Sequence, residues 1–159
     1  MNNIAYPCQG ATMEIKEVAC RVQDAMNLLI KRDRFLLQQK ASEWAIAHRL
    51  AVYMEMQFPE WNIDCEYNRV GWGISPKYLN DSRVRPDIVV HHRGYVSRVH
   101  NLLIIELKKS PKKLDVLKAR AYTEQPTSSR QFQYQYGLAL AVLGESRPRW
   151  FSNGKEMEP

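Results

Sequence analysis

Two short apolar runs near the middle of the chain decide the fold: PDIVVHH, residues 86–92, and NLLIIELKK, residues 101–109. Both are rich in β-branched and long aliphatic residues and are apolar on both faces, which is typical of buried strands. Gly94 marks a turn between them. The sequence therefore predicts a central hairpin.

The residues on either side of this hairpin indicate helices and further strands. Residues 13–58 contain no Gly or Pro and predict helices with a break near residues 31–34, the second helix running over residues 39–58. Alternation and turn residues predict a strand over 63–70, a helix over 112–123, a strand over 136–143 and a final edge strand in RWFS, residues 149–152. Residues 71–85 have the composition of a long loop, either a substrate loop or a plain surface loop.

This order of elements predicts an α/β fold in which helices flank a central mixed sheet. Residues 39–159 are expected to form the main domain and residues 1–38 an N-terminal helical extension, within a single compact unit. A length of 159 residues suffices for one hydrophobic core without disulfides.

Composition narrows the class of protein. The chain is 45% hydrophobic and 25% charged, values that are average for globular proteins and indicate neither a disordered nor a membrane-spanning chain. Its three cysteines form no CxxC pair, and residues 1–13 lack the features of a secretion signal, so we expect a cytoplasmic protein with reduced thiols. No HExxH, GxSxG or Walker sequence is present.

Positive charge is concentrated in one third of the chain. Residues 69–120 hold twelve Lys or Arg against four Asp or Glu, whereas the whole chain has a net charge of +6. A local excess of this kind is what binding to a phosphate backbone requires, although a solvated basic surface would have the same composition.

Three charged residues lie at the ends of the two central runs. If the hairpin is centred between residues 96 and 97, Asp87 lies opposite Glu106, and a shift of two residues would set it opposite Lys108. In either register the two carboxylates and the ammonium converge.

Buried carboxylates need compensation, and a divalent cation would provide it. Mg²⁺ prefers oxygen ligands, so Asp87 and Glu106 are its expected ligands, with Mn²⁺ as a substitute. Lys108 would then orient a metal-activated water. Glu43 lies within the apolar stripe of the second helix and either completes the metal site or forms a structural ion pair with Lys108 or a buried Arg.

Pro86-Asp87, followed after eighteen residues by Glu106-Leu107-Lys108, resembles the motif of the PD-(D/E)XK nuclease superfamily. The resemblance covers roughly residues 39–143 and implies a restriction-endonuclease-like core of helix, three-stranded antiparallel meander, helix and strand. It also implies that the backbone carbonyl of Leu107 joins the two carboxylates as a metal ligand and that Glu43 assists.

The resulting expectation is a Mg²⁺-dependent endonuclease that hydrolyses phosphodiester bonds in DNA, with RNA left open as a substrate and no membrane partner. A small domain that cuts both strands suggests a homodimer. The alternative is a catalytically silent nuclease-fold subunit that binds nucleic acid or a partner. Trp72 is a candidate for base stacking. The candidate backbone contacts are Arg69, Lys77, Arg83, Arg85, Lys109, Lys112 and Lys113.

Overall fold

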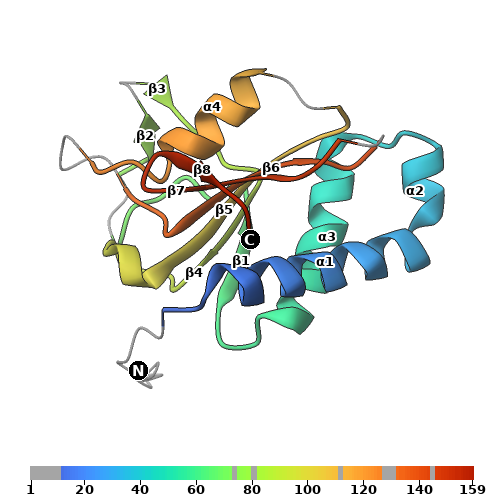
Figure 1. Cartoon of the computed structure of the whole chain (residues 1–159), viewed down its shortest axis with the longest axis horizontal. Coiled ribbons are helices and arrows are strands. Elements are labelled where there is room, and N and C mark those ends of the chain that lie inside the picture. Colours follow the sequence, from blue (N-terminus) through green and yellow to red (C-terminus); the bar gives the residue numbers. More distant parts are fainter. Residues whose placement is uncertain (1–11, 73–74, 80–81, 111–112, 127–131, 144–145) are drawn as a thin grey trace.

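A six-stranded mixed sheet with helices on both faces forms the centre of the protein (Figure 1). The computed structural model describes residues 12–72, 75–79, 82–110, 113–126, 132–143 and 146–159. The helices are α1 (Ile15–Arg32), α2 (Arg34–Gln38), α3 (Glu43–Gln57) and α4 (Lys113–Ala121), with a 3₁₀ turn at Arg98–His100. The strands are β1 (Asn62–Cys65), β2 (Tyr78–Leu79), β3 (Ser82–Arg83), β4 (Ile88–His91), β5 (Asn101–Lys108), β6 (Tyr136–Ala141), β7 (Arg149–Ser152) and β8 (Lys155–Met157).

The predicted central hairpin is present as the antiparallel pair β4–β5. Ile88 pairs with Ile105 and Val90 with Leu103, so the register is the one that continues to Asp87 opposite Glu106. The register shifts after Val90, at the end of the hairpin far from Asp87. The first of the two registers considered from the sequence is therefore confirmed where it matters for the site.

The other strands extend the sheet to the order β1-β4-β5-β6-β7-β8. Strand β1 is antiparallel to β4, and β6 is parallel to β5 because α4 forms the crossover between them. The prediction of RWFS as an edge strand is wrong, since β7 pairs with β8 on its outer side. A two-residue turn joins these strands, and its residues Asn153 and Gly154 both have positive φ, at 49° and 71°.

Helices α1 and α3 cover one face of the sheet with the largest hydrophobic core. Buried residues of α1, among them Val22 and Leu29, belong to this core together with Leu50 of α3 and Leu103 of β5. The N-terminal helix thus contributes to the main core of the fold. No helix in the described part of the chain is long and apolar enough to cross a membrane.

The break between helices and the start of α3 set the position of Glu43. The chain turns at Asp33, as the sequence predicts, but the next long helix begins at Glu43 and not at residue 39. The Ser42 hydroxyl accepts a hydrogen bond from the Ala45 amide at 3.1 Å and so caps this helix. Glu43 therefore lies at the helix start, where its side chain reaches the end of β5.

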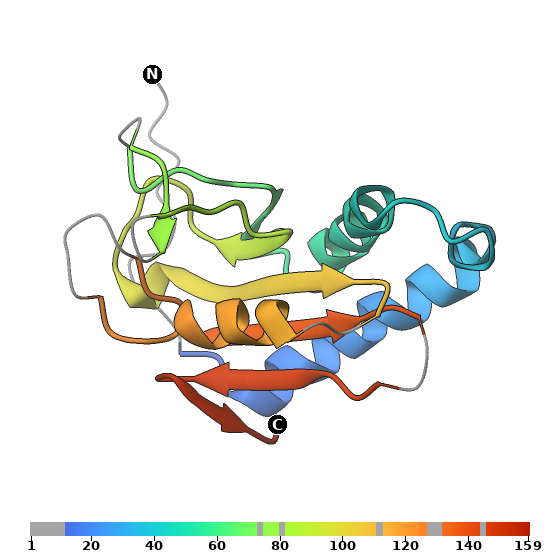
Figure 2. The same ribbon diagram turned by 90° about the horizontal axis from the view of Figure 1, so that it is seen from above.

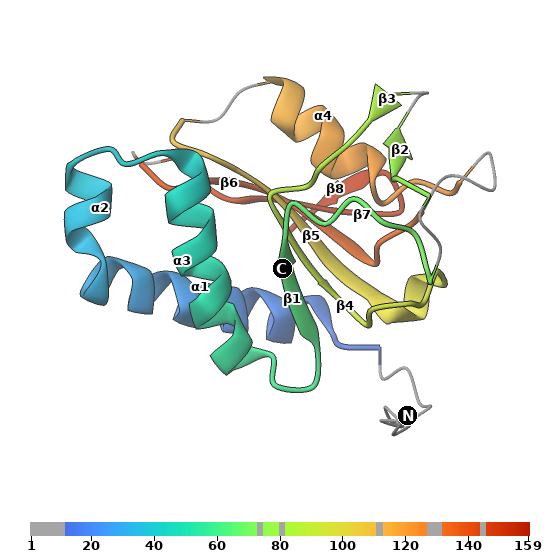
Figure 3. The same cartoon turned by 180° about the vertical axis from the view of Figure 1, so that it is seen from behind.

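Helix α4 lies across β5 and β6 on the opposite face, with α1 on the far side of the sheet (Figure 2). The small hairpin β2–β3 lies beside α4 on this face (Figure 3). Gly137 of β6 allows the close approach of α4, because a Cβ at this position would lie 2.1 Å from the carbonyl oxygen of Ala119. Two further core clusters fill the space beneath α4 and the segment that carries β2 and β3.

Candidate metal centre at the end of the central hairpin

The hairpin brings Asp87 and Glu106 to the same end of the sheet. Asp87 immediately precedes β4, and Glu106 lies near the end of β5, on the strand face that also carries Ile104. Strand alternation places Asp87 on the face of Val89, and Val89 and Ile104 share the core cluster on the α4 side. The two carboxylates thus start from neighbouring strands on one face, as the sequence predicts.

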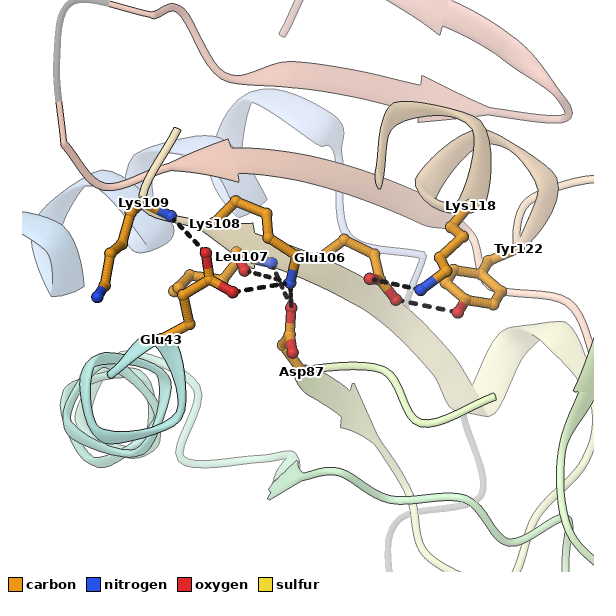
Figure 4. A network of polar contacts seen from close by, with 8 residues as sticks. All are labelled: Glu43, Asp87, Glu106, Leu107, Lys108, Lys109, Lys118 and Tyr122. Carbon is orange, nitrogen blue, oxygen red and sulfur yellow. Dashed lines mark hydrogen bonds and ion pairs between the residues drawn. The ribbon is translucent and has the colours of Figure 1, made fainter. Parts of the chain in front are cut away.

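The Lys108 ammonium lies among three oxygen atoms (Figure 4). Its Nζ atom is 2.9 Å from the Leu107 carbonyl oxygen, 3.3 Å from Oδ2 of Asp87 and 3.4 Å from Oε2 of Glu43. Partial burial lowers the pKa of Lys108, but attraction by Asp87 and then Glu43 outweighs it, so the pKa lies above its usual value. A cationic group therefore occupies the point where three of the four expected metal ligands converge.

Asp87 is held by the backbone as well as by this ammonium. Its Oδ2 atom accepts a hydrogen bond from the Leu107 amide at 2.7 Å. Burial nevertheless raises the pKa of Asp87 above its usual value, because it outweighs the hydrogen bond from Leu107 and the attraction of Lys108. The carboxylate is thus fixed in direction but incompletely compensated in charge.

Glu43 joins α3 to the end of β5. Its Oε1 atom accepts a hydrogen bond from the Lys109 amide at 3.0 Å, while Oε2 faces Lys108. The ion pair with Lys108 is the structural alternative that the sequence left open for Glu43. The same position also directs the carboxylate towards Asp87 and the Leu107 carbonyl, so the geometry accommodates both roles.

Glu106 turns away from Lys108 and towards α4 (Figure 4). Its Oε1 atom accepts a hydrogen bond from the Tyr122 hydroxyl at 2.9 Å, and Oε2 is 3.7 Å from Nζ of Lys118. Burial, reinforced by repulsion from Asp87, raises the pKa of Glu106 to about 7. Tyr122 and Lys118 therefore hold a carboxylate that its surroundings make costly to ionise.

Tyr122 and Lys118 are site residues that sequence reasoning missed. Lys118 lies in the last turn of α4, and Tyr122 directly follows the helix and donates its amide to the Lys118 carbonyl at 3.0 Å. Their spacing of four residues, in the helix predicted after the expected catalytic strand, was the available signal. Asp115, three residues before Lys118, is only 5% exposed and Lys118 faces Glu106, so these two residues do not form an exposed ion pair.

The oxygen atoms around Lys108 have the chemistry that Mg²⁺ prefers: carboxylates and a backbone carbonyl. Among the residues that the structure describes, no three His, Cys, Asp or Glu side chains are placed together to hold a metal ion. The orientation of Glu106 towards Tyr122 accounts for this, since Glu43 and Asp87 alone meet at Lys108. The donor set fits Mg²⁺ if the Glu106 side chain rotates towards Asp87.

The candidate nucleic-acid contacts fall into different environments. Arg69, Arg83 and Arg85 are exposed, and all belong to the segment between β1 and β4. Lys109 donates a hydrogen bond to the Lys40 carbonyl at 2.7 Å. Lys112 lies outside the described residues, and Lys113 is the first residue of α4.

Lys77 differs from the sequence expectation, because it is only 3% exposed. Its ammonium donates to the Tyr67 carbonyl at 3.0 Å and lies over the rings of Tyr67, Phe132 and Tyr134. Burial lowers the pKa of Lys77 to about 7, against the attraction of Asp64. This lysine is part of the core beneath the loop and does not face a nucleic acid.

The comparisons with known proteins found no relative. No family model matches the chain, and neither a curated protein nor a solved structure is significantly similar to it. What the site can do is therefore argued from its own geometry.

Proposed function

We propose that this protein is a Mg²⁺-dependent nuclease that hydrolyses phosphodiester bonds in DNA. The observation that carries the proposal is the convergence of the Asp87 and Glu43 carboxylates and the Leu107 carbonyl on one cationic group at 2.9–3.4 Å. A cluster of oxygen donors that holds an ammonium in this way offers a divalent cation most of its ligands. Glu106 lies opposite Asp87 and would supply the remaining carboxylate once its side chain rotates from Tyr122 towards Asp87.

The restriction-endonuclease-like core is part of the same proposal. In support, α3 is followed by the antiparallel strands β1, β4 and β5, then by α4 and by β6 parallel to β5. This is the order that the resemblance to the PD-(D/E)XK superfamily implies.

Within this proposal, Asp87, Glu106, Glu43 and the Leu107 carbonyl would hold Mg²⁺ or Mn²⁺. A bound cation supplies a water of lowered pKa and offsets charge on the scissile phosphate. The Lys108 ammonium is placed to donate a hydrogen bond to the attacking water or to a phosphate oxygen. Tyr122 and Lys118 orient Glu106, and the Lys109 amide fixes Glu43 at the strand end.

The proposal is tested by nicking of supercoiled plasmid in MgCl2, with metal binding followed separately by Mn²⁺ electron paramagnetic resonance. We expect Asp87→Ala to lose metal binding and to reduce nicking at least about 100-fold. Lys108→Met should reduce nicking to a similar extent but keep or tighten metal binding, since it removes a competing cation from the oxygen atoms.

Glu156→Gln is the matched control. Glu156 is a surface carboxylate on β8 that pairs with Arg149, so this variant should nick plasmid as the wild type does. Linear product in addition to nicked circles would indicate that two copies act together, as a homodimer would. Absence of nicking by the wild type in both Mg²⁺ and Mn²⁺, with single-stranded DNA and RNA also intact, would overturn the proposal in favour of a catalytically silent binding subunit.

A further inference from the structure

An exposed apolar patch lies at the end of the central hairpin that is far from Asp87. It consists of Trp72, Tyr95, Val96 and Val99, which are 90%, 41%, 57% and 46% exposed. We call these four residues the aromatic patch. Exposed apolar side chains lower the solubility of a protein, and a contiguous patch of them is typical of a binding surface.

The Trp72 ring is supported from below by the turn between β4 and β5. A Cβ at residue 94 would lie 2.6 Å from the Trp72 indole, so the ring rests directly on the backbone of Gly94, whose φ is +88°. Gly71 in turn lies against Val96, where a Cβ would be 3.0 Å from a Val96 methyl carbon. The indole is thus seated on the hairpin end while most of its surface remains open to solvent.

Tyr95 is the outermost member of a series of rings in contact with one another. Its ring centroid lies 4.2 Å from that of His100, which lies 5.3 Å from His92, which in turn lies 4.2 Å from Trp61 at an interplanar angle of 4°. Trp61 is buried at 8% exposure and anchors the series in the core. Tyr95 is therefore presented on a rigid base, and little conformational entropy is lost when another ring contacts it.

Two exposed arginines lie beside the patch. Arg69 is exposed and precedes Trp72 by three residues, and the Arg93 side chain is 55% exposed beside Gly94. The Arg93 guanidinium is paired with the Asp64 carboxylate at 2.6 Å, which also bonds His91 at 2.9 Å, so Asp64 offsets part of the positive charge here. The ligand that complements this surface combines flat apolar rings with negative charge.

We propose that the aromatic patch stacks unpaired bases of a single-stranded nucleic acid, so that the substrate of the proposed nuclease contains a single-stranded segment. Aromatic side chains stack on every base, whereas the bases of an intact duplex are already stacked on one another. The chain from Arg69 to Asp87 joins the patch to the candidate metal centre and carries the exposed Arg83 and Arg85. This inference deepens the proposed function. That the bound single strand is a substrate rests on the proposed nuclease activity, whereas the binding itself does not require cleavage.

Binding is measured by fluorescence anisotropy with a labelled 20-nucleotide single strand and with a blunt duplex of two fully complementary strands, both in EDTA so that nothing is cut. We expect Trp72→Ala and Tyr95→Ala each to weaken single-strand binding about 10- to 100-fold and to change duplex binding less than about 2-fold. Trp72→Phe, which keeps an aromatic ring, should stay within about 3-fold of the wild type. Phe35→Ala is the matched control, because Phe35 is 70% exposed on the distant α2 and should leave both affinities unchanged.

Three results would overturn the inference: equal losses for the single strand and the duplex, an effect of Phe35→Ala as large as that of Trp72→Ala, or dissociation of a protein dimer by Trp72→Ala in sedimentation without nucleic acid. The two proposals fail separately. If plasmid is never cut but single-strand binding depends on Trp72, only the nuclease proposal fails. If plasmid is cut but Trp72→Ala binds single strands as the wild type does, only the stacking proposal fails.

Discussion

The Glu106 carboxylate is buried beside Asp87, and this arrangement costs the fold stability at neutral pH. Because burial and Asp87 raise its pKa to about 7, the folded protein retains a proton that the unfolded chain releases at lower pH. The free energy of unfolding therefore falls as pH rises from the unfolded value of about 4.3 through about 7, and no loss is expected below this window. Such a cost is typical of a site that a cation completes.

Glu106→Gln should remove this cost while its side-chain oxygen still accepts the Tyr122 hydrogen bond. We expect the variant to be more stable than the wild type by about 1–3 kcal/mol at pH 8 in EDTA, with no such gain at pH 4.5. Urea unfolding at both pH values measures the difference.

Glu156→Gln serves as the control for this experiment, because Arg149 holds the pKa of Glu156 below its usual value and neutral glutamine gains nothing there. A Glu106→Gln variant that is less stable than the wild type at pH 8, or equally changed at both pH values, would show that the carboxylate is well compensated in the absence of metal.

At the same scale, the sequence predicted the residues on the central strands better than their partners. Strand alternation placed Asp87 and Glu106 on one face because that pattern depends only on local geometry. It could not show that Glu106 turns to Tyr122, nor that Lys77 is buried among Tyr67, Phe132 and Tyr134, since these contacts join segments far apart in the chain.

Among the elements, the accuracy of prediction followed the strength of the local signal. The apolar runs of β4 and β5 determined the hairpin and its register, whereas the short and partly polar β8 gave little periodicity. The Asn153-Gly154 pair between β7 and β8 is a strong two-residue hairpin signal, and with it the edge assignment of β7 could have been avoided. The start of α3 depended on the Ser42 cap within an otherwise helix-favouring sequence.

Helix α1 offers a prediction at the scale of elements. Leu29 is fully buried in the main core and its neighbour Ile30 is 48% exposed, so the two residues report on the inner and outer faces of the helix. Leu29→Ala should lower the free energy of unfolding by about 2–4 kcal/mol, because it leaves a cavity between α1 and α3. Ile30→Ala should lower it by less than about 1 kcal/mol.

Chemical denaturation of both variants, followed by far-ultraviolet circular dichroism, measures these differences. Equal and small effects would mean that α1 does not pack stably on the core and is not part of one compact unit.

For the whole molecule, the distribution of charge matters more than its total. The net charge is +6, but residues 69–120 alone carry +8, and within them Arg69, Arg83 and Arg85 are exposed on the segment that joins the aromatic patch to the candidate metal centre. When a nucleic acid binds along this segment, counterions are released at the phosphates that side-chain cations neutralise. Removing cations that contact phosphates therefore lowers the salt dependence of the affinity, and this identifies the interface.

The double variant Arg83→Gln/Arg85→Gln should therefore reduce the slope of log affinity against log salt concentration by about 2 for duplex DNA measured by anisotropy in EDTA. The control variant Lys16→Gln/Lys31→Gln removes the same two charges from exposed positions on α1, on the other side of the sheet. It should leave the slope within about 0.5 of the wild type, since long-range attraction is screened at these salt concentrations. Equal reductions in the two double variants would show that total charge, and not the segment between β1 and β4, attracts the nucleic acid.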